Sequence, residues 1–198
     1  MVCSLPIITI GASTTALYYV TLKMARDEEG YITKSFFKSF KENFLQATGI
    51  WLIFVALGLI LVADLRIISL PEYAALIPGD TFKSVVFTMI VAITIILAFI
   101  FVYVFPVLAR FVNSIKNTIK NAFLMSLRHL PFSFLLILIP AVPLVLMYFN
   151  PVFYFLILIM FSVQAYISSK ILVKIFDNYM PKEEVEGTIN KEIHEEEG

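Results

Sequence analysis

Long apolar runs separated by short polar segments dominate the chain. Four of these runs hold about 20 residues or more each, at positions 45–65, 85–108, 130–149 and 152–173. A helix rises about 1.5 Å per residue and the hydrocarbon core of a bilayer is roughly 30 Å thick, so about 20 apolar residues are needed to cross it. The pattern predicts an all-α fold, a polytopic membrane helix bundle with four full spans.

The chain begins with a shorter apolar segment. Residues 5–10 are apolar but too few to cross a bilayer alone. We predict a short N-terminal helix that begins at Thr14 with Ser13 as its N-cap, and a further hydrophobic helix upstream of Met1. No basic residue precedes Lys23, so the pattern is not that of a cleaved signal peptide.

Two polar connectors have the periodicity of amphipathic helices. In the first, phenylalanines recur at i, i+3 and i+7 (Phe37, Phe40 and Phe44), and in the second, residues 111–127, apolar residues recur every four positions. We expect surface helices whose phenylalanines lie at the acyl boundary and whose lysines face anionic lipid. The alternative is that one of them is a docking surface for a partner.

Basic residues are concentrated in alternate connectors. Residues 23–41 hold five, residues 64–83 hold only Arg66 and Lys83, and residues 110–128 hold four with no acidic residue. The positive-inside rule then predicts that the first and third of these segments, and the C-terminus, are cytoplasmic. Residues 1–180 are expected to form the integral membrane domain, and the acidic residues 181–198 a disordered cytoplasmic tail.

The composition excludes several functional classes. The sequence is 60% hydrophobic and 15% charged with a net charge of zero, whereas about 25% of residues are charged in soluble domains. The single cysteine, Cys3, excludes an internal disulfide, and the two histidines supply few metal ligands. No nucleophile–base pair or glycine-rich phosphate loop occurs. We therefore expect no enzymatic activity, no cofactor, no metal and no nucleic-acid partner.

Polar residues inside the spans are few, and none near a span centre is ionisable. Thr94 and Gln164 lie deep, where such side chains more often join helices through hydrogen bonds than bind a solute. Outside the spans, Arg26, Asp27 and Glu28 form the sharpest charged cluster, with Gly30 placed to be the C′ residue of the preceding helix. The cluster is either a solvated helix end or a contact region.

The N-terminal residues carry a family resemblance. Residues 5–19 (Leu-Pro-Ile-Ile-Thr-Ile-Gly-Ala-Ser-Thr-Thr-Ala-Leu-Tyr-Tyr), 26–31 and 35–44 resemble the opening of the YesL-type bacterial membrane proteins, a family of unknown function also called DUF624. The likeness is specific through about residue 55. It implies a location in the bacterial cytoplasmic membrane and an upstream first helix. Many members are encoded beside carbohydrate uptake systems of the ATP-binding-cassette (ABC) type.

Two functions follow from the pattern and the resemblance together. The first is a non-enzymatic accessory of an ABC-type carbohydrate uptake system, in contact with its permease components as well as with the lipid bilayer. The second is a small transporter or channel for a neutral solute, acting alone or as a homodimer. The expected partner-contact residues are Arg26, Asp27, Glu28, Phe37, Phe40 and Phe44, and the expected helix-packing residues are Thr94 and Gln164.

Overall fold

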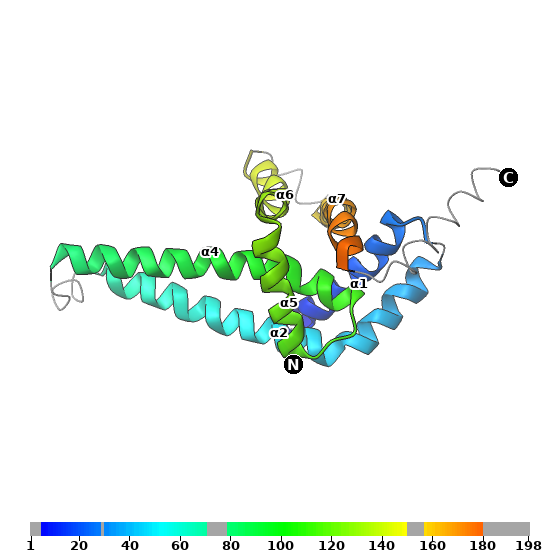
Figure 1. Cartoon of the computed structure of the whole chain (residues 1–198), viewed down its shortest axis with the longest axis horizontal. Coiled ribbons are helices and arrows are strands. Elements are labelled where there is room, and N and C mark those ends of the chain that lie inside the picture. The colour runs from blue at the N-terminus through cyan, green and yellow to red at the C-terminus, as the bar shows by residue number, and fades with distance from the viewer. Residues whose placement is uncertain (1–4, 29, 71–78, 150–156, 180–198) are drawn as a thin grey trace.

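The computed structural model describes residues 5–28, 30–70, 79–149 and 157–179, and every regular element in that part of the chain is a helix (Figure 1). The predicted all-α class is confirmed. The predicted acidic tail lies outside the described residues. The elements are α1 (Leu5–Ala25), α2 (Ile32–Ser69), α4 (Asp80–Arg110), α5 (Ile115–Arg128), α6 (Leu130–Phe149), α7 (Ile157–Phe176) and the 3-10 turn η3 (Asp177–Tyr179).

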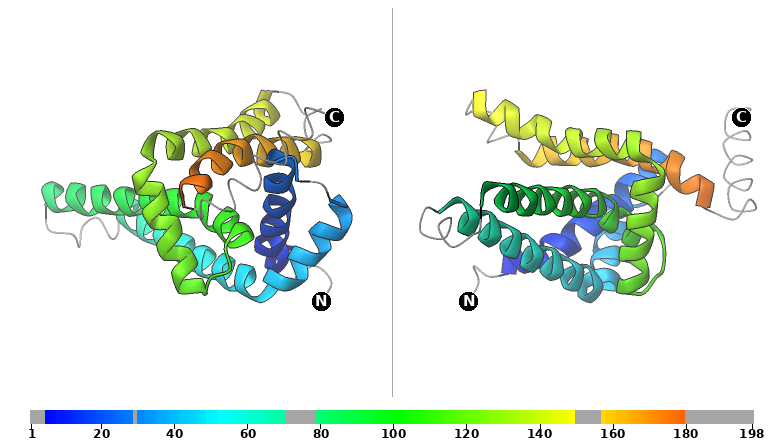
Figure 2. Two further views of the ribbon diagram at one scale, coloured as in Figure 1. Left: turned by 45° about the vertical axis from the view of Figure 1, so that its right-hand side comes forward. Right: turned by 60° about the vertical axis from the view of Figure 1, so that its left-hand side comes forward.

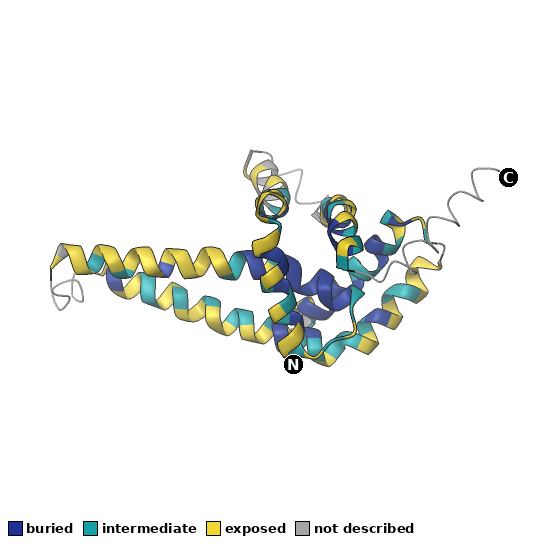
Figure 3. Cartoon of the chain, in the orientation of Figure 1, coloured by how far each residue is buried: buried dark blue, intermediate teal, exposed yellow. Residues whose placement is uncertain are grey.

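Two long helices, α2 and α4, form a hairpin that projects from the rest of the molecule (Figure 1). Aromatic side chains join them where they enter the body of the protein, with the Phe54 and Phe101 ring centroids 5.4 Å apart. Beyond that point their apolar side chains are mostly exposed (Figure 3). Exposed apolar side chains on a long helix are what a lipid environment requires.

The buried core lies where α1, α4 and α7 converge (Figure 3). Tyr103, Val104, Leu172 and Phe176 are almost completely buried there. Helices α6 and α7 are seen nearly end-on in Figure 1 and lie side by side along their length in Figure 2. They therefore cross the α2–α4 hairpin rather than extend it.

Helix α1 lies directly against α2 because Gly11 has no side chain. A Cβ atom at Gly11 would lie 2.5 Å from the Ala47 carbonyl oxygen and 2.8 Å from the Trp51 Cβ atom. Ala12 and Ala47 are fully buried at the same contact. Small residues of this kind let helix backbones approach closely in membranes, where packing replaces the hydrophobic effect as the force between helices.

The prediction of a short N-terminal helix capped by Ser13 is wrong. Helix α1 begins at Leu5, has 21 residues and passes through Ser13 without a break. Its polar residues do not interrupt it because their hydroxyls bond within the helix: Thr15 Oγ1 donates to the Gly11 carbonyl at 2.9 Å and Thr21 Oγ1 to the Leu17 carbonyl at 3.0 Å. The short apolar run at residues 5–10 therefore underestimated the length of this helix.

The C-terminal cap of α1 is Asp27 and not Gly30. Asp27 has a positive φ of 53°, a conformation that aspartate adopts more readily than most residues. The Glu28 amide donates to the Lys23 carbonyl at 3.1 Å and the Asp27 amide to the Met24 carbonyl at 3.3 Å. This pair of hydrogen bonds is a Schellman motif with Asp27 as its C′ residue, and the helix ends at Ala25, five residues before the glycine.

The number of spans stays a prediction. Within the described residues, three helical segments (32–69, 81–110 and 159–179) are long and apolar enough to cross a membrane. A fourth is obtained if α5 and the first half of α6, which meet at 106°, form one broken span. The chain is thus a multi-pass helical membrane protein, and α2 runs without a break from the first connector into the first predicted span.

The second connector is helical from Ile115 only, because Ser114 caps α5 and accepts a hydrogen bond from the Asn117 amide at 3.4 Å. Phe111 lies before this cap, with its ring 5.3 Å from that of Phe176. Ile119 and Phe123 pack against the core. The apolar face of this connector is therefore partly buried against the core, while Leu124 and Leu127 are exposed beside it. The expected position at the acyl boundary stays a prediction.

Candidate functional site

Charged side chains join the ends of α1, α4 and α7 at one end of the molecule, which we call the basic end. Arg26 Nη2 donates to Asp177 Oδ1, and the Arg26 side chain is buried, with 8% of the residue exposed. Glu28 lies between Arg110, at 3.7 Å, and Lys23, at 4.0 Å. These contacts tie η3 and the C-terminal ends of α1 and α4 together.

The predicted contact cluster is therefore divided. Arg26 and Glu28 form ion pairs within the protein, with Arg26 buried and Glu28 half-buried, whereas Asp27 is exposed. The phenylalanines divide in the same way. Phe37 is 56% exposed, whereas Phe40 and Phe44 pack against the core with their centroids 5.5 Å apart. Of the six predicted contact residues, Asp27 and Phe37 are the ones that a partner could reach directly.

A central cavity of about 410 Å³ lies between α1, α2, α4, α6 and α7. The part of its wall that the structure describes carries no charged side chain. Four of the lining residues come from α4, and the others come from α1, α2, α6 and α7. The lining residues are Ile10, Thr14, Tyr18, Trp51, Ala98, Phe101, Val102, Phe105, Ile137, Pro140, Phe161, Gln164 and Ala165.

The polar groups of the cavity wall are all neutral. Thr14 and Tyr18 come from α1, and the Tyr18 hydroxyl is hydrogen-bonded to Ser168. Gln164 is half-buried, and its amide makes no hydrogen bond to any described residue. Trp51 adds an indole whose Nε1 is buried without a hydrogen-bond partner in the same part of the chain. Such a wall offers donors, acceptors and aromatic faces to an uncharged molecule.

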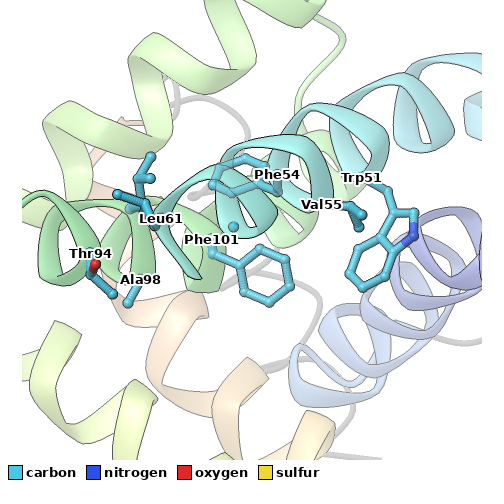
Figure 4. Close-up of a pocket in the computed structure, with 9 residues that line it drawn as sticks. Trp51, Phe54, Val55, Leu61, Thr94, Ala98 and Phe101 are labelled. Atoms are coloured by element: carbon cyan, nitrogen blue, oxygen red, sulfur yellow. The ribbon is translucent and has the colours of Figure 1, made fainter. Parts of the chain in front are cut away.

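A second pocket, of about 310 Å³, opens between α2 and α4 and shares three side chains with the cavity (Figure 4). Phe101 lies between Trp51 on one side and Ala98 on the other. Thr94 also lines this pocket, and its hydroxyl donates to the Ile90 carbonyl of its own helix at 2.8 Å. Neither Thr94 nor Gln164 joins two helices through a hydrogen bond to a described residue.

Sequence reasoning found Gln164 but missed most of the cavity wall. Tyr18, Trp51, Phe101 and Phe105 were not predicted because an aromatic residue in an apolar run looks the same whether it faces lipid, core or cavity. The one available signal was a neutral polar residue deep in a span. No group of three or more potential metal ligands occurs among the described residues.

Comparison with known families supports the N-terminal resemblance. Residues 1–65 match the family described as "Protein of unknown function, DUF624". The resemblance to YesL-type proteins predicted from the sequence is thus confirmed over this third of the chain, which includes α1, the Gly11 contact and most of α2. No curated protein and no solved structure matches the chain.

Proposed function

We propose that this multi-pass membrane protein is a non-enzymatic carrier of a neutral molecule, which it binds in the central cavity. The observation that carries the proposal is the half-buried Gln164 amide, which lines the cavity without a hydrogen bond to any described residue. Trp51 Nε1, which comes from the same cavity wall, is buried without a hydrogen-bond partner among the described residues. A buried polar group left unpaired costs about 1–3 kcal/mol, so a ligand that pairs with it gains affinity.

The size and chemistry of the cavity support the same function. Its volume of about 410 Å³ falls within the range of roughly 300–1,000 Å³ that small-molecule sites occupy. Aromatic faces from Trp51, Phe101 and Phe105 can stack on a ring or an apolar surface. The described wall has no charge to offset the desolvation of an ion, which favours an uncharged ligand.

Trp51 provides the test, because it is the only tryptophan in the chain and it lines the cavity. Neutral solutes are titrated against the purified protein in lipid nanodiscs while Trp51 emission is recorded. A cavity ligand changes the emission with saturation. Gln164→Leu is expected to weaken binding about tenfold, because one hydrogen bond to the ligand is lost.

Gln46→Leu is the matched control, since it removes the same amide from a residue of α2 that does not line the cavity. Equal weakening by the two variants would remove the role assigned to Gln164. If no neutral solute produces a saturable change, and none is taken up by liposomes that contain the protein, the carrier function is wrong.

A second candidate is an accessory role beside an ABC-type carbohydrate permease, and it is favoured by exposed apolar side chains at the basic end. Tyr31, Ile32 and Phe37 are all exposed at the start of α2, next to exposed lysines. Large exposed aromatic residues are typical anchors of a protein interface.

The accessory role predicts that Phe37→Ser abolishes co-purification of permease components in mild detergent while the thermal stability of the protein is retained. Phe40→Ser is the contrasting variant, because Phe40 packs against the core and its loss lowers stability. If both variants retain the permease, or if no permease subunit co-purifies with the wild-type protein, α2 is not the contact.

A further inference from the structure

A groove of about 280 Å³ lies between α6 and α7, next to the central cavity. Its described wall is aliphatic apart from Gln164, with Ile139 and Val142 from α6 and Val163 and Ile167 from α7. Val163 is 51% exposed. The groove therefore opens onto the apolar outer surface of α6 and α7. Both helices were predicted to span the membrane, so this surface would be in contact with lipid chains.

Gln164 belongs to both spaces, because it lines the central cavity and the α6–α7 groove. Neighbouring residues line different spaces on both helices. On α7, Val163 lines the groove and Ala165 lines the cavity. On α6, Ile139 lines the groove and Pro140 lines the cavity. The two spaces are thus separated by one layer of side chains, with Gln164 in that layer.

The backbone of this layer is weakened at Pro140. Proline has no amide hydrogen, so the helical hydrogen bond to the carbonyl four residues earlier, at Leu136, is missing. Ala165, which follows Gln164 on α7, lines the cavity together with Pro140. Gln164 is the one residue that lines both spaces, so the groove and the cavity meet at its side chain.

We propose that the ligand is a neutral amphiphile that reaches the cavity from the lipid between α6 and α7. Its uncharged polar head lies in the cavity and pairs with the Gln164 amide, and its apolar chain lies in the α6–α7 groove. The inference rests on the proposed function and narrows its ligand class. A chain-bearing ligand fills both spaces, because the aliphatic groove adjoins the cavity at Gln164.

The test uses one neutral head with and without a chain: dodecyl glucoside, brominated along the chain, and methyl glucoside. The full-length protein is placed in phosphatidylcholine nanodiscs, and bromine quenching of Trp51 is recorded. We expect saturable quenching that unbrominated dodecyl glucoside reverses. Val163→Phe, which fills the groove, and Gln164→Leu should each weaken this binding about tenfold.

Ile167→Phe fills the same groove from a second position and keeps the test valid if Val163→Phe does not fold. Val62→Phe, at a similarly exposed position on α2 outside the groove, is the matched control and should leave quenching unchanged. The helical content and thermal stability of each variant are measured alongside.

The outcomes separate this inference from the proposed function. If methyl glucoside stabilises the protein with an affinity that Val163→Phe does not alter, while the brominated chain quenches only without saturation, the cavity binds a neutral solute and the lipid route is wrong. If neither glucoside gives a saturable, Gln164-dependent response, the lipid route fails. The wider solute titration then decides the carrier function separately.

Discussion

Gly11 determines how closely α1 can approach α2. A methyl group at this position would lie 2.5 Å from a backbone carbonyl oxygen of α2, which cannot rotate away as a side chain could. We predict that Gly11→Ala lowers the free energy of unfolding by about 1–3 kcal/mol, as measured by thermal unfolding in detergent, because the helices must separate to admit the methyl group. Trp51 emission should shift as well, since Trp51 Cβ lies at the same contact.

Gly58 provides the internal comparison for this prediction. A Cβ atom at Gly58 meets nothing within 4 Å, so Gly58→Ala should be neutral or stabilise α2 by up to about 1 kcal/mol through helix propensity alone. Equal effects at the two glycines would mean that helix propensity, and not the close approach, controls stability. Sequence reasoning placed Gly11 within a family motif but gave no reason for it, because the reason lies in a residue of another helix.

At the scale of the helices, the contact between Arg26 and Asp177 holds the end of α7 against the end of α1. The guanidinium is buried, whereas the Asp177 side chain is 39% exposed. We predict that Asp177→Ala costs about 1–3 kcal/mol of stability in thermal unfolding, because a buried charge loses one of its partners. Glu28→Gln should cost less than about 1 kcal/mol, since its ion pairs are longer and partly exposed. A larger loss for Glu28→Gln than for Asp177→Ala would contradict this order.

The helices themselves were largely predictable, and their ends were not. Runs of apolar residues identified α4 and α6, because length and hydropathy are properties of the segment alone. Helix α1 extends well beyond the apolar run from which it was predicted, and α5 begins only after its cap Ser114, whose side chain accepts a hydrogen bond from the Asn117 amide. Of the cavity wall, only Gln164 was identified from the sequence, since five helices contribute to the cavity and their relative placement is a tertiary property.

For the whole molecule, the structure brings the basic connectors together. Ion pairs and helix ends place the segments around Arg26, Arg110 and Lys174 at the basic end, while the tip of the α2–α4 hairpin lies far from it (Figure 1). The alternation of basic residues along the sequence predicts that these segments share one side of the membrane, and their proximity in the structure agrees with that prediction.

Cysteine accessibility decides the orientation. After Cys3→Ser removes the only natural thiol, Thr81→Cys marks the exposed tip of the hairpin and Lys120→Cys the exposed face of α5. Because basic connectors are retained in the cytoplasm, we predict that a membrane-impermeant maleimide labels Thr81→Cys in intact cells and Lys120→Cys only after permeabilisation. The reverse pattern would invert the topology, and equal labelling of both in intact cells would show that the hairpin does not cross the membrane. Either result would also move the exposed Phe37 away from the compartment in which a cytoplasmic partner could bind it.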